Sequence, residues 1–204
     1  MNELKRTPLY QAHVDSGAKL VPFAGWEMPV SYPSGIKEEH AAVREKVGLF
    51  DVSHMGRFRV LGPDAEAAID YLVAGNFKKL PDGKWLYTVL CNHKGTVIDD
   101  LLVGKLGDDL HIVVNAANLQ VDFEHMNAEI EKKSFDAKVI DESSQSALIA
   151  VQGPQSRDLL EKLLMINLME LQYYAMLTTE WEGNEIIVSR TGYTGELGFE
   201  LFVP

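Results

Sequence analysis

The middle of this chain contains the stretch KWLYTVLCNHKGTVIDDLLV at residues 84–103. The runs WLYTVL and VIDDLLV are apolar and rich in β-branched and aromatic residues, and the turn-forming CNHKGT joins them, so together they indicate a β-hairpin. Before the hairpin, RFRVL at 57–61 alternates like a strand, and GPD at 62–64 opens a helix that ends at Gly75. After the hairpin, LHIVVN forms a further strand.

A long helix from about 117 to 133 and the strand FDAKVI complete this region. The expected element order over residues 57–140 is therefore β-α-β-β-β-α-β. This order predicts a ferredoxin-like split βαβ unit with one extra strand.

The flanking segments predict a second set of elements. We expect a helix over 8–16 with Thr7 as its N-cap. The proline- and glycine-rich stretch 20–35 suggests an ordered but irregular loop, and a helix over 34–46 follows it. Towards the C-terminus, ALIAVQG is a buried strand, residues 154–164 form a helix, and EIIVS and FELFV are strands around a glycine-rich loop. The chain is expected to be an α+β protein with mixed or antiparallel sheets.

The composition narrows the classes of function. The chain has 204 residues, of which 46% are hydrophobic and 24% charged, as in ordinary globular domains. Its formal charge of −11 argues against nucleic acid as the main partner, because a duplex binder needs a positive footprint. Cys91 is the only cysteine, which excludes an intrachain disulfide and a cysteine-rich zinc site. No apolar run approaches the ~18 residues of a membrane helix, so we expect no membrane partner and a cytoplasmic protein.

Asp99 and Asp100 lie inside the apolar run VIDDLLV. Side chains alternate along a strand, so the two carboxylates point to opposite faces and cannot form a dyad. Because both faces are apolar, at least one carboxylate lies near a buried surface, where it needs a partner and is often functional. The alternative is one exposed aspartate and one aspartate paired with backbone or a basic side chain.

The segment SRTGYTGELGFE contains Gly192, Gly195 and Gly198 with Tyr193 between the first two. Glycines allow a ligand to approach the backbone closely, but the same spacing also suits a glycine-rich hairpin. The segment leads into a strand rather than a helix, so phosphate binding at a helix N-terminus is unsupported. The six histidines show no metal-ligand spacing, and we expect no metal site.

Seven motifs occur together in order along the chain, and their combination is specific. They are RTPLY at 6–10, FAGWEMP at 23–29, GLFDVSHMG at 48–56, GTVIDDLLV at 95–103, VVNAAN at 113–118, VQGP at 151–154 and SRTGYTGELGFE at 189–200. Over nearly the whole chain they closely resemble the glycine cleavage T-protein family, the aminomethyltransferases.

This resemblance implies an enzyme with a defined reaction. Members take the aminomethyl group carried on the lipoyl arm of the H-protein, transfer its carbon to tetrahydrofolate and release ammonia, leaving 5,10-methylenetetrahydrofolate. The resemblance places the essential aspartate at Asp100, the second carboxylate of IDD. A carboxylate in a dry site stabilises the positive charge that develops as ammonia leaves, and it can orient the folate N10.

The resemblance also implies a cavity for tetrahydrofolate. Carried over residue by residue, its contacts would be Tyr87, Asn115, Tyr193 and Glu200, with Tyr173 and Met55 as further candidates. Glu200 would accept two hydrogen bonds from the amino-pyrimidine edge of the pterin. The tyrosines offer flat apolar faces with a polar tip.

The family pattern further implies how the chain is divided. A folate-binding domain would comprise 1–56 and 147–204, with the ferredoxin-like domain 57–146 inserted between them. Family members continue into a barrel-like C-terminal domain, with an arginine that contacts folate, and we expect both to be absent here. Two alternatives stay open: a folate-binding relative without transferase activity, and an inactive truncated fragment.

Overall fold

The predicted hairpin is present as strands β5 (Lys84–Cys91) and β6 (Val97–Leu106), with Val89 opposite Asp100 in its register. The computed structural model describes residues 3–204. Contacts divide the chain into two compact units, Met55–Gln145 and the pair of segments Met1–His54 and Ser146–Pro204. The hairpin belongs to the first of these units.

The unit Met55–Gln145 is built on one five-stranded sheet with the strand order β5-β6-β7-β4-β8. Every neighbouring pair in this sheet is antiparallel. Along the chain, α3 separates β4 from the hairpin and α4 separates β7 from β8. The remaining elements of the unit are β4 (Gly56–Leu61), α3 (Ala65–Leu72), the short 3₁₀ helix η1 (Phe77–Lys79), β7 (Asp109–Val114), α4 (Leu119–Lys132) and β8 (Lys138–Asp141).

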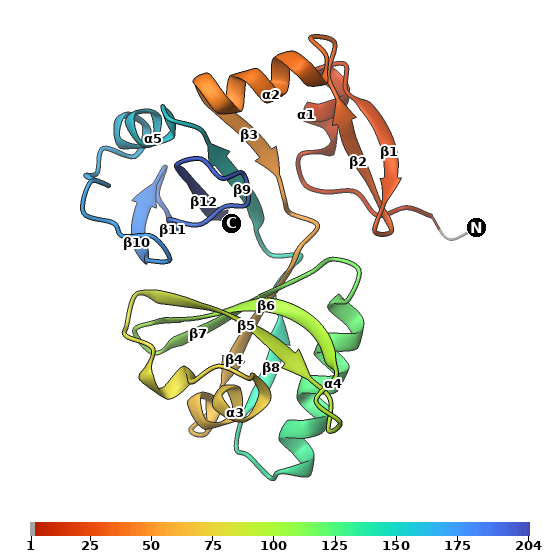
Figure 1. The fold of residues 1–204 in the computed structure, drawn as a ribbon, viewed down its shortest axis with the longest axis vertical. Helices are drawn as coiled ribbons and strands as arrows, with labels where there is room; N and C mark the ends of the chain where they lie inside the picture. Colours follow the sequence, from red (N-terminus) through yellow and green to blue (C-terminus); the bar gives the residue numbers. More distant parts are fainter. Residues whose placement is uncertain (1–2) are drawn as a thin grey trace. The chain divides into compact units, whose positions relative to one another are not determined.

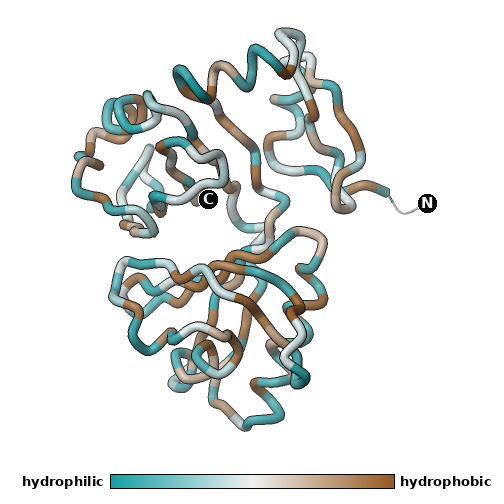
Figure 2. The backbone as a smooth tube through the Cα atoms, in the orientation of Figure 1, coloured by the Kyte–Doolittle hydropathy of each residue, from teal (hydrophilic) through white to brown (hydrophobic). Residues whose placement is uncertain are grey.

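One hydrophobic core joins this sheet to both helices, which lie on the same face of it (Figure 1). Ile69 of α3 and Met126 of α4 are fully buried in the core together with Val103 of β6. Figure 2 shows hydrophobic stretches along the strands, while the turn that follows α4 is hydrophilic. Burying apolar surface from both layers is the main term that stabilises this unit.

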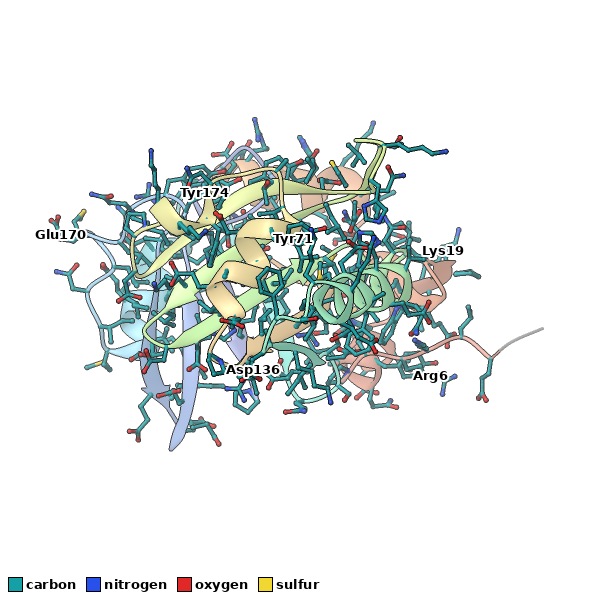
Figure 3. The ribbon with its side chains drawn as sticks, turned by 90° about the horizontal axis from the view of Figure 1, so that it is seen from below. Arg6, Lys19, Tyr71, Asp136, Glu170 and Tyr174 are labelled. Atoms are coloured by element: carbon teal, nitrogen blue, oxygen red, sulfur yellow. The ribbon has the colours of Figure 1, made fainter. Side chains whose placement is uncertain are left out.

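A polar contact also links the two helices. Tyr71, labelled on α3 in Figure 3, donates a hydrogen bond of 3.0 Å from its hydroxyl to Oε2 of Glu129 on α4. Its ring packs against Phe135, with 5.9 Å between the ring centroids. Tyrosine suits this position because it combines an apolar ring with a polar tip.

The other unit contains a second five-stranded antiparallel sheet with the order β10-β11-β12-β9-β3. The buried Val151 of β9, Phe199 of β12 and Leu160 of α5 belong to its hydrophobic core. The elements are β3 (Gly48–Asp51), β9 (Ala147–Gln152), α5 (Ser156–Leu164), β10 (Met176–Trp181), β11 (Asn184–Ser189) and β12 (Gly198–Val203).

The N-terminal part of this unit contains a hairpin that sequence analysis missed. The stretch predicted to be an irregular loop forms β1 (Lys19–Phe23) and β2 (Trp26–Ser31), an antiparallel pair. The turn Ala24-Gly25 has φ of +47° and +83°, and two positive φ values are the geometry that a two-residue hairpin turn needs. Its prolines are compatible with strands here because each strand of a two-stranded sheet has a free edge.

Other boundaries differ from the prediction in smaller ways. Helix α1 (Tyr10–Asp15) is shorter than predicted, and its N-cap is Leu9 rather than Thr7. Helix α2 (Ile36–Glu45) begins and ends within the predicted range, and it buries Val43 while His40 is exposed. Neither the edge strand β3 at residues 48–51 nor β10 was predicted. Within residues 3–204, no helix combines the length and the apolar composition needed to cross a membrane.

Candidate active site

The two neighbouring aspartates of β6 lie in opposite environments. Asp99 is 4% exposed and lies on the same face as Leu101 and Val103, which belong to the core beneath α3 and α4. Asp100 is exposed and points to the other face of the sheet. The strand period therefore separates the two carboxylates, as the sequence predicts, and leaves Asp100 accessible to a ligand.

Two of the predicted site residues hold the Asp100 carboxylate. The Tyr87 hydroxyl on β5 donates a hydrogen bond of 2.7 Å to Oδ2 of Asp100. The Asn115 amide, just after β7, donates to Oδ1 of Asp100 at 3.2 Å and to its backbone oxygen at 3.0 Å. Each carboxylate oxygen thus has its own donor, which fixes the orientation of a charged group that solvent can reach. The structure brings together Asp100, Tyr87 and Asn115.

A buried layer lies behind this group. Asp99 accepts hydrogen bonds from the Asn115 backbone N–H at 3.1 Å, from Nδ2 of Asn115 at 2.9 Å and from Nδ2 of Asn118 at 2.6 Å. Asp122, in the first turn of α4, is completely buried and interacts with Asp99. Burial, a hydrogen bond with Asp99 and the charge of Asp99 raise the pKa of Asp122 to about 8.

Met55 is placed by the backbone at the same end of the sheet as Asn115. Gly56, which follows Met55, pairs with Val114, which precedes Asn115. The backbone oxygen of Met55 accepts a hydrogen bond of 2.6 Å from Nη1 of Arg57, so Met55 is held by its main chain.

Glu200 lies in the other unit, on β12, among buried polar groups. Thr191 donates a hydrogen bond from its hydroxyl to Oε2 of Glu200. The Thr191 hydroxyl lies 2.8 Å from that of Ser189, which is fully buried on β11. Burial raises the pKa of Glu200 above its ordinary value, and the Thr191 hydrogen bond opposes this by favouring the charged form.

The glycine-rich segment 189–200 folds around a single buried side chain, Gln152. Its Nε2 donates to the backbone oxygens of Thr191 at 3.1 Å and Phe199 at 3.2 Å, and its Oε1 accepts from Thr194 at 2.9 Å. A Cβ added at Gly198 would lie 2.1 Å from Oε1 of Gln152. Glycine is therefore required there by close packing.

A pocket of about 310 Å³ opens beside this segment. It is lined by Tyr173, Arg190, Thr191, Gly192, Gly195, Glu196, Leu197 and Gly198. Tyr173 therefore lies where a ligand could contact it, and Glu200 bonds to one of the lining residues. Tyr193, by contrast, is fully exposed and does not line the pocket.

Sequence reasoning missed four polar residues. Asn118 and Asp122 lie near the aspartates of β6, and Gln152 and Thr191 lie at the glycine-rich segment. Asn118 and Asp122 are four residues apart across the start of a helix, so the two side chains share one face there. That spacing could have marked them as partners of the aspartates on β6. Gln152 lies in the motif VQGP, but the motif alone does not show that its side chain is buried against the glycine-rich segment.

His13 lies between Asp51 and Tyr32. Nε2 of His13 donates to Oδ2 of Asp51 at 2.9 Å, and Nδ1 lies 2.9 Å from the Tyr32 hydroxyl. Among the described residues, no three His, Cys, Asp or Glu side chains are grouped as metal ligands would be.

Comparisons with known proteins cover nearly the whole chain. The family described as the GCVT N-terminal domain matches residues 9–204, a span that contains all seven motifs except the first residues of RTPLY. The chain belongs to this GCVT family. It corresponds to the N-terminal portion of glycine cleavage T-proteins.

Curated relatives of this GCVT chain are named as aminomethyltransferases. One from Thermotoga sp. (strain RQ2) is 52% identical over 201 residues, covering 98% of this chain and 54% of the relative. One from Staphylococcus saprophyticus is 47% identical over 203 residues, covering 98% of this chain and 55% of the relative. The chain thus spans about half the length of the curated relatives it matches.

Solved structures give the same picture of the GCVT fold. The crystal structure of the glycine cleavage system aminomethyltransferase T from Bartonella henselae matches with a TM-score of 0.87 and 36% identity, covering 99% of this chain and 54% of that one. A heterotetrameric sarcosine oxidase from Corynebacterium sp. U-96 matches with a TM-score of 0.56 and 18% identity, which is a likeness of fold alone.

Proposed function

We propose that this chain carries the site for tetrahydrofolate-dependent aminomethyl transfer in glycine cleavage. In this reaction the methylene carbon moves from the aminomethyl-lipoyl arm of the H-protein to tetrahydrofolate, and ammonia is released. The observation that supports it most is the exposed Asp100 carboxylate, held by Tyr87 and Asn115, in a chain 52% identical to an aminomethyltransferase.

The proposed chemistry balances without a further reactant. The carbon–nitrogen bond to ammonia and the carbon–sulfur bond to the lipoyl arm break, and two bonds form from the carbon to folate nitrogens. The two protons displaced from those nitrogens end on the sulfur and on the departing ammonia. The products are 5,10-methylenetetrahydrofolate, dihydrolipoyl H-protein and ammonia.

Asp100 is proposed to stabilise the cationic, iminium-like carbon that forms as ammonia leaves. A negative group aimed at developing positive charge lowers the barrier most when it is already oriented. Tyr87 and Asn115 provide that orientation, since each donates to a different oxygen of the carboxylate. The same carboxylate is proposed to orient the folate N10 for ring closure.

Four further residues are proposed as contacts of tetrahydrofolate. Glu200 can accept hydrogen bonds from the amino-pyrimidine edge of a pterin when its carboxylate is ionised. Tyr173 lines a pocket whose volume, about 310 Å³, is at the lower end of the range for small-molecule sites. Tyr193 and Met55 are proposed on the family resemblance alone.

The same resemblance supports a proposal about domain organisation. Residues 1–56 and 147–204 would form the folate-binding domain, and residues 57–146 a ferredoxin-like insertion. In support, four adjacent strands follow the order β8-β4-β7-β6, which matches a split βαβ sheet, and β5 is added outside β6.

A transfer assay tests the proposed function directly. Aminomethylated H-protein and tetrahydrofolate are mixed with the 204-residue chain, and ammonia and methylenetetrahydrofolate are both measured. We expect turnover that falls at least about a hundredfold in Asp100→Asn, because that change removes the charge and keeps the shape. Asp108→Asn, an exposed aspartate in the same unit, is the matched control and should match the parent chain.

The other outcomes separate the alternatives. Saturable binding of tetrahydrofolate, weakened by Glu200→Gln but without ammonia release, would support a folate-binding relative that lacks transferase activity. A cooperatively folded chain that does not bind tetrahydrofolate would reject the proposal for this polypeptide. Full turnover in a folded Asp100→Asn variant would reject the role of that residue alone.

A further inference from the structure

The carboxyl group of Asp122 is buried without a hydrogen-bond donor. It is 0% exposed, and among residues 3–204 neither carboxyl oxygen accepts a hydrogen bond from a donor group. Its interaction is with the carboxyl group of Asp99. A buried carboxylate that faces another carboxylate would be uncompensated and costly.

Asp99 is the acceptor of this pair. It receives three amide hydrogens, two from Asn115 and one from Asn118, and both of its oxygens are used. Amide donors of this kind stabilise the charged form of a carboxyl group. The proton that two adjacent buried carboxyl groups must share therefore resides on Asp122.

We propose that Asp122 is a positioning residue: its buried carboxylic acid donates a hydrogen bond to Asp99 and thereby holds the Asn115 amide against Asp100. Asp122 does not touch the reacting atoms. It acts through Asp99 and Asn115. This inference rests on the function proposed above for Asp100, and it adds a residue that neither the motifs nor the resemblance singled out.

The hydrogen bonds at Asn115 explain why such support matters. Its single Nδ2 group serves three acceptors: Oδ1 of Asp99 at 2.9 Å, the backbone oxygen of Asp100 at 3.0 Å and Oδ1 of Asp100 at 3.2 Å. An amide shared among three oxygens is oriented by the acceptor that is itself held most firmly. Asp99 is buried and Asp100 is exposed, so Asp99 sets the direction of the amide.

Two effects of opposite sign act on the protonation of Asp122: the dipole of α4, and burial next to Asp99. Asp122 lies in the first turn of α4, where the helix dipole favours a negative charge. Burial and the charge of Asp99 act in the opposite direction and are larger, because they raise the pKa of Asp122 to about 8. The acid is therefore neutral at pH 7.

Infrared spectroscopy of the isolated chain tests the proton without requiring activity. We expect a carboxylic-acid C=O absorption at pH 7 that is lost in Asp122→Asn and kept in Glu124→Gln. Glu124 is the matched control because it is an exposed acid on the same helix. Absence of that absorption, or its persistence in folded Asp122→Asn, would overturn the proposal.

The side-chain amide of Asn115 tests the positioning. In ¹⁵N-asparagine-labelled chain we expect the two amide hydrogens of Asn115 to be protected from exchange. Their exchange should accelerate at least about tenfold in Asp122→Ala. Asp122→Asn, which keeps a neutral donor for Asp99, should restore most of that protection. If Asp122→Ala fails to fold, the Asn variant and the infrared band still test the proposal. Equal protection in parent and Ala variant would overturn the proposal.

Turnover separates this inference from the proposed function. If the parent chain transfers aminomethyl groups, we expect kcat to fall about tenfold or more in Asp122→Ala and to recover in part in Asp122→Asn. The parent chain could show the carboxylic-acid band and the protected amide but no transfer. That result would reject the proposed function, while the proton on Asp122 and the position of the Asn115 amide would still be supported. Transfer with an unaltered kcat in folded Asp122→Ala would reject the positioning role.

Discussion

Asn115 and Asp99 are joined twice: the backbone N–H of Asn115 donates to Oδ2 of Asp99 at 3.1 Å, and its side-chain Nδ2 donates to Oδ1 at 2.9 Å. A residue held at both its main chain and its side chain has little freedom to turn. The side-chain amide also donates a hydrogen bond to Oδ1 of Asp100, which lies on the other face of the sheet. A buried carboxylate thus controls the surroundings of an exposed one.

Replacing Asn115 by aspartate should be strongly destabilising. Asn115→Asp removes a donor from Asp99 and Asp100 and sets a third carboxylate between them, so we expect a loss of about 2–4 kcal/mol in the free energy of unfolding. Urea unfolding at pH 7 measures this loss. Asn167→Asp is the control, because Asn167 is exposed and acts as an acceptor, a role that aspartate keeps. Equal losses in the two variants would contradict the role given to the Asn115 donor.

The separation of Asp99 from Asp100 was predictable from sequence, and the partner of Asp99 was not. Alternation along a strand is a local property of the backbone, so VIDDLLV alone assigns the two carboxylates to opposite faces. The meeting of Asp99 with Asp122 depends on where the first turn of α4 packs against β6, which is a tertiary relationship. The resemblance supplied Tyr87 and Asn115, whose contacts with Asp100 the structure then gives.

The hairpin of β1 and β2 was not predicted, and the reason is different. Three prolines and two glycines in 20–35 outweighed a weak strand pattern, although only Ala24 and Gly25 form the turn. The prolines Pro22 and Pro29 fit because a two-stranded sheet leaves each strand with an unpaired side. Composition indicates where regular structure is interrupted, but not whether prolines lie on the paired side of a strand.

Gly198 should be intolerant of a side chain for packing reasons rather than conformational ones. A Cβ there would lie 2.1 Å from Oε1 of Gln152, a 1%-exposed side chain with three hydrogen bonds to the glycine-rich segment. We expect Gly198→Ala to lower the free energy of unfolding by about 2–4 kcal/mol, because Gln152 must give up hydrogen bonds to move. Thermal or urea unfolding measures the loss.

Gly195→Ala is the contrasting variant for that prediction. Gly195 has a φ of +75°, but its nearest atom to an added Cβ is Nη1 of Arg44 at 3.8 Å. The cost there should be the conformational strain alone, about 1 kcal/mol. A larger loss in Gly195→Ala than in Gly198→Ala would mean that backbone conformation, not the contact with Gln152, makes the glycines necessary.

Asp51 should make the chain sensitive to acid. Burial alone would raise the pKa of Asp51, but hydrogen bonds from Ser53 and His13 outweigh burial and lower it below 3.8. A lowered pKa means that the stabilisation is present above the unfolded value and is lost as pH falls through the folded one. We expect Asp51→Asn to cost about 2–3 kcal/mol at pH 7 and to flatten the acid limb of a stability–pH curve. An unchanged acid limb would argue against it, with Asp15→Asn, an exposed aspartate on α1, as the control.

Asp122 should give the opposite pH dependence. Its pKa is about 8 in the folded chain against 3.8 in the ordinary carboxyl, so between these values the folded state holds a proton that the unfolded state lacks. Stability contributed by this proton is complete below about pH 4 and falls as pH rises, by at most about 1.4 kcal/mol per pH unit. We expect Asp122→Asn to lose this decline, so that its free energy of unfolding approaches or exceeds that of the parent chain at pH 8. Urea unfolding at pH 5, 6.5 and 8 measures the difference, and Glu124→Gln should follow the parent curve. A constant difference between Asp122→Asn and the parent across this range would mean that Asp122 is already ionised, and the buried proton would have to be abandoned.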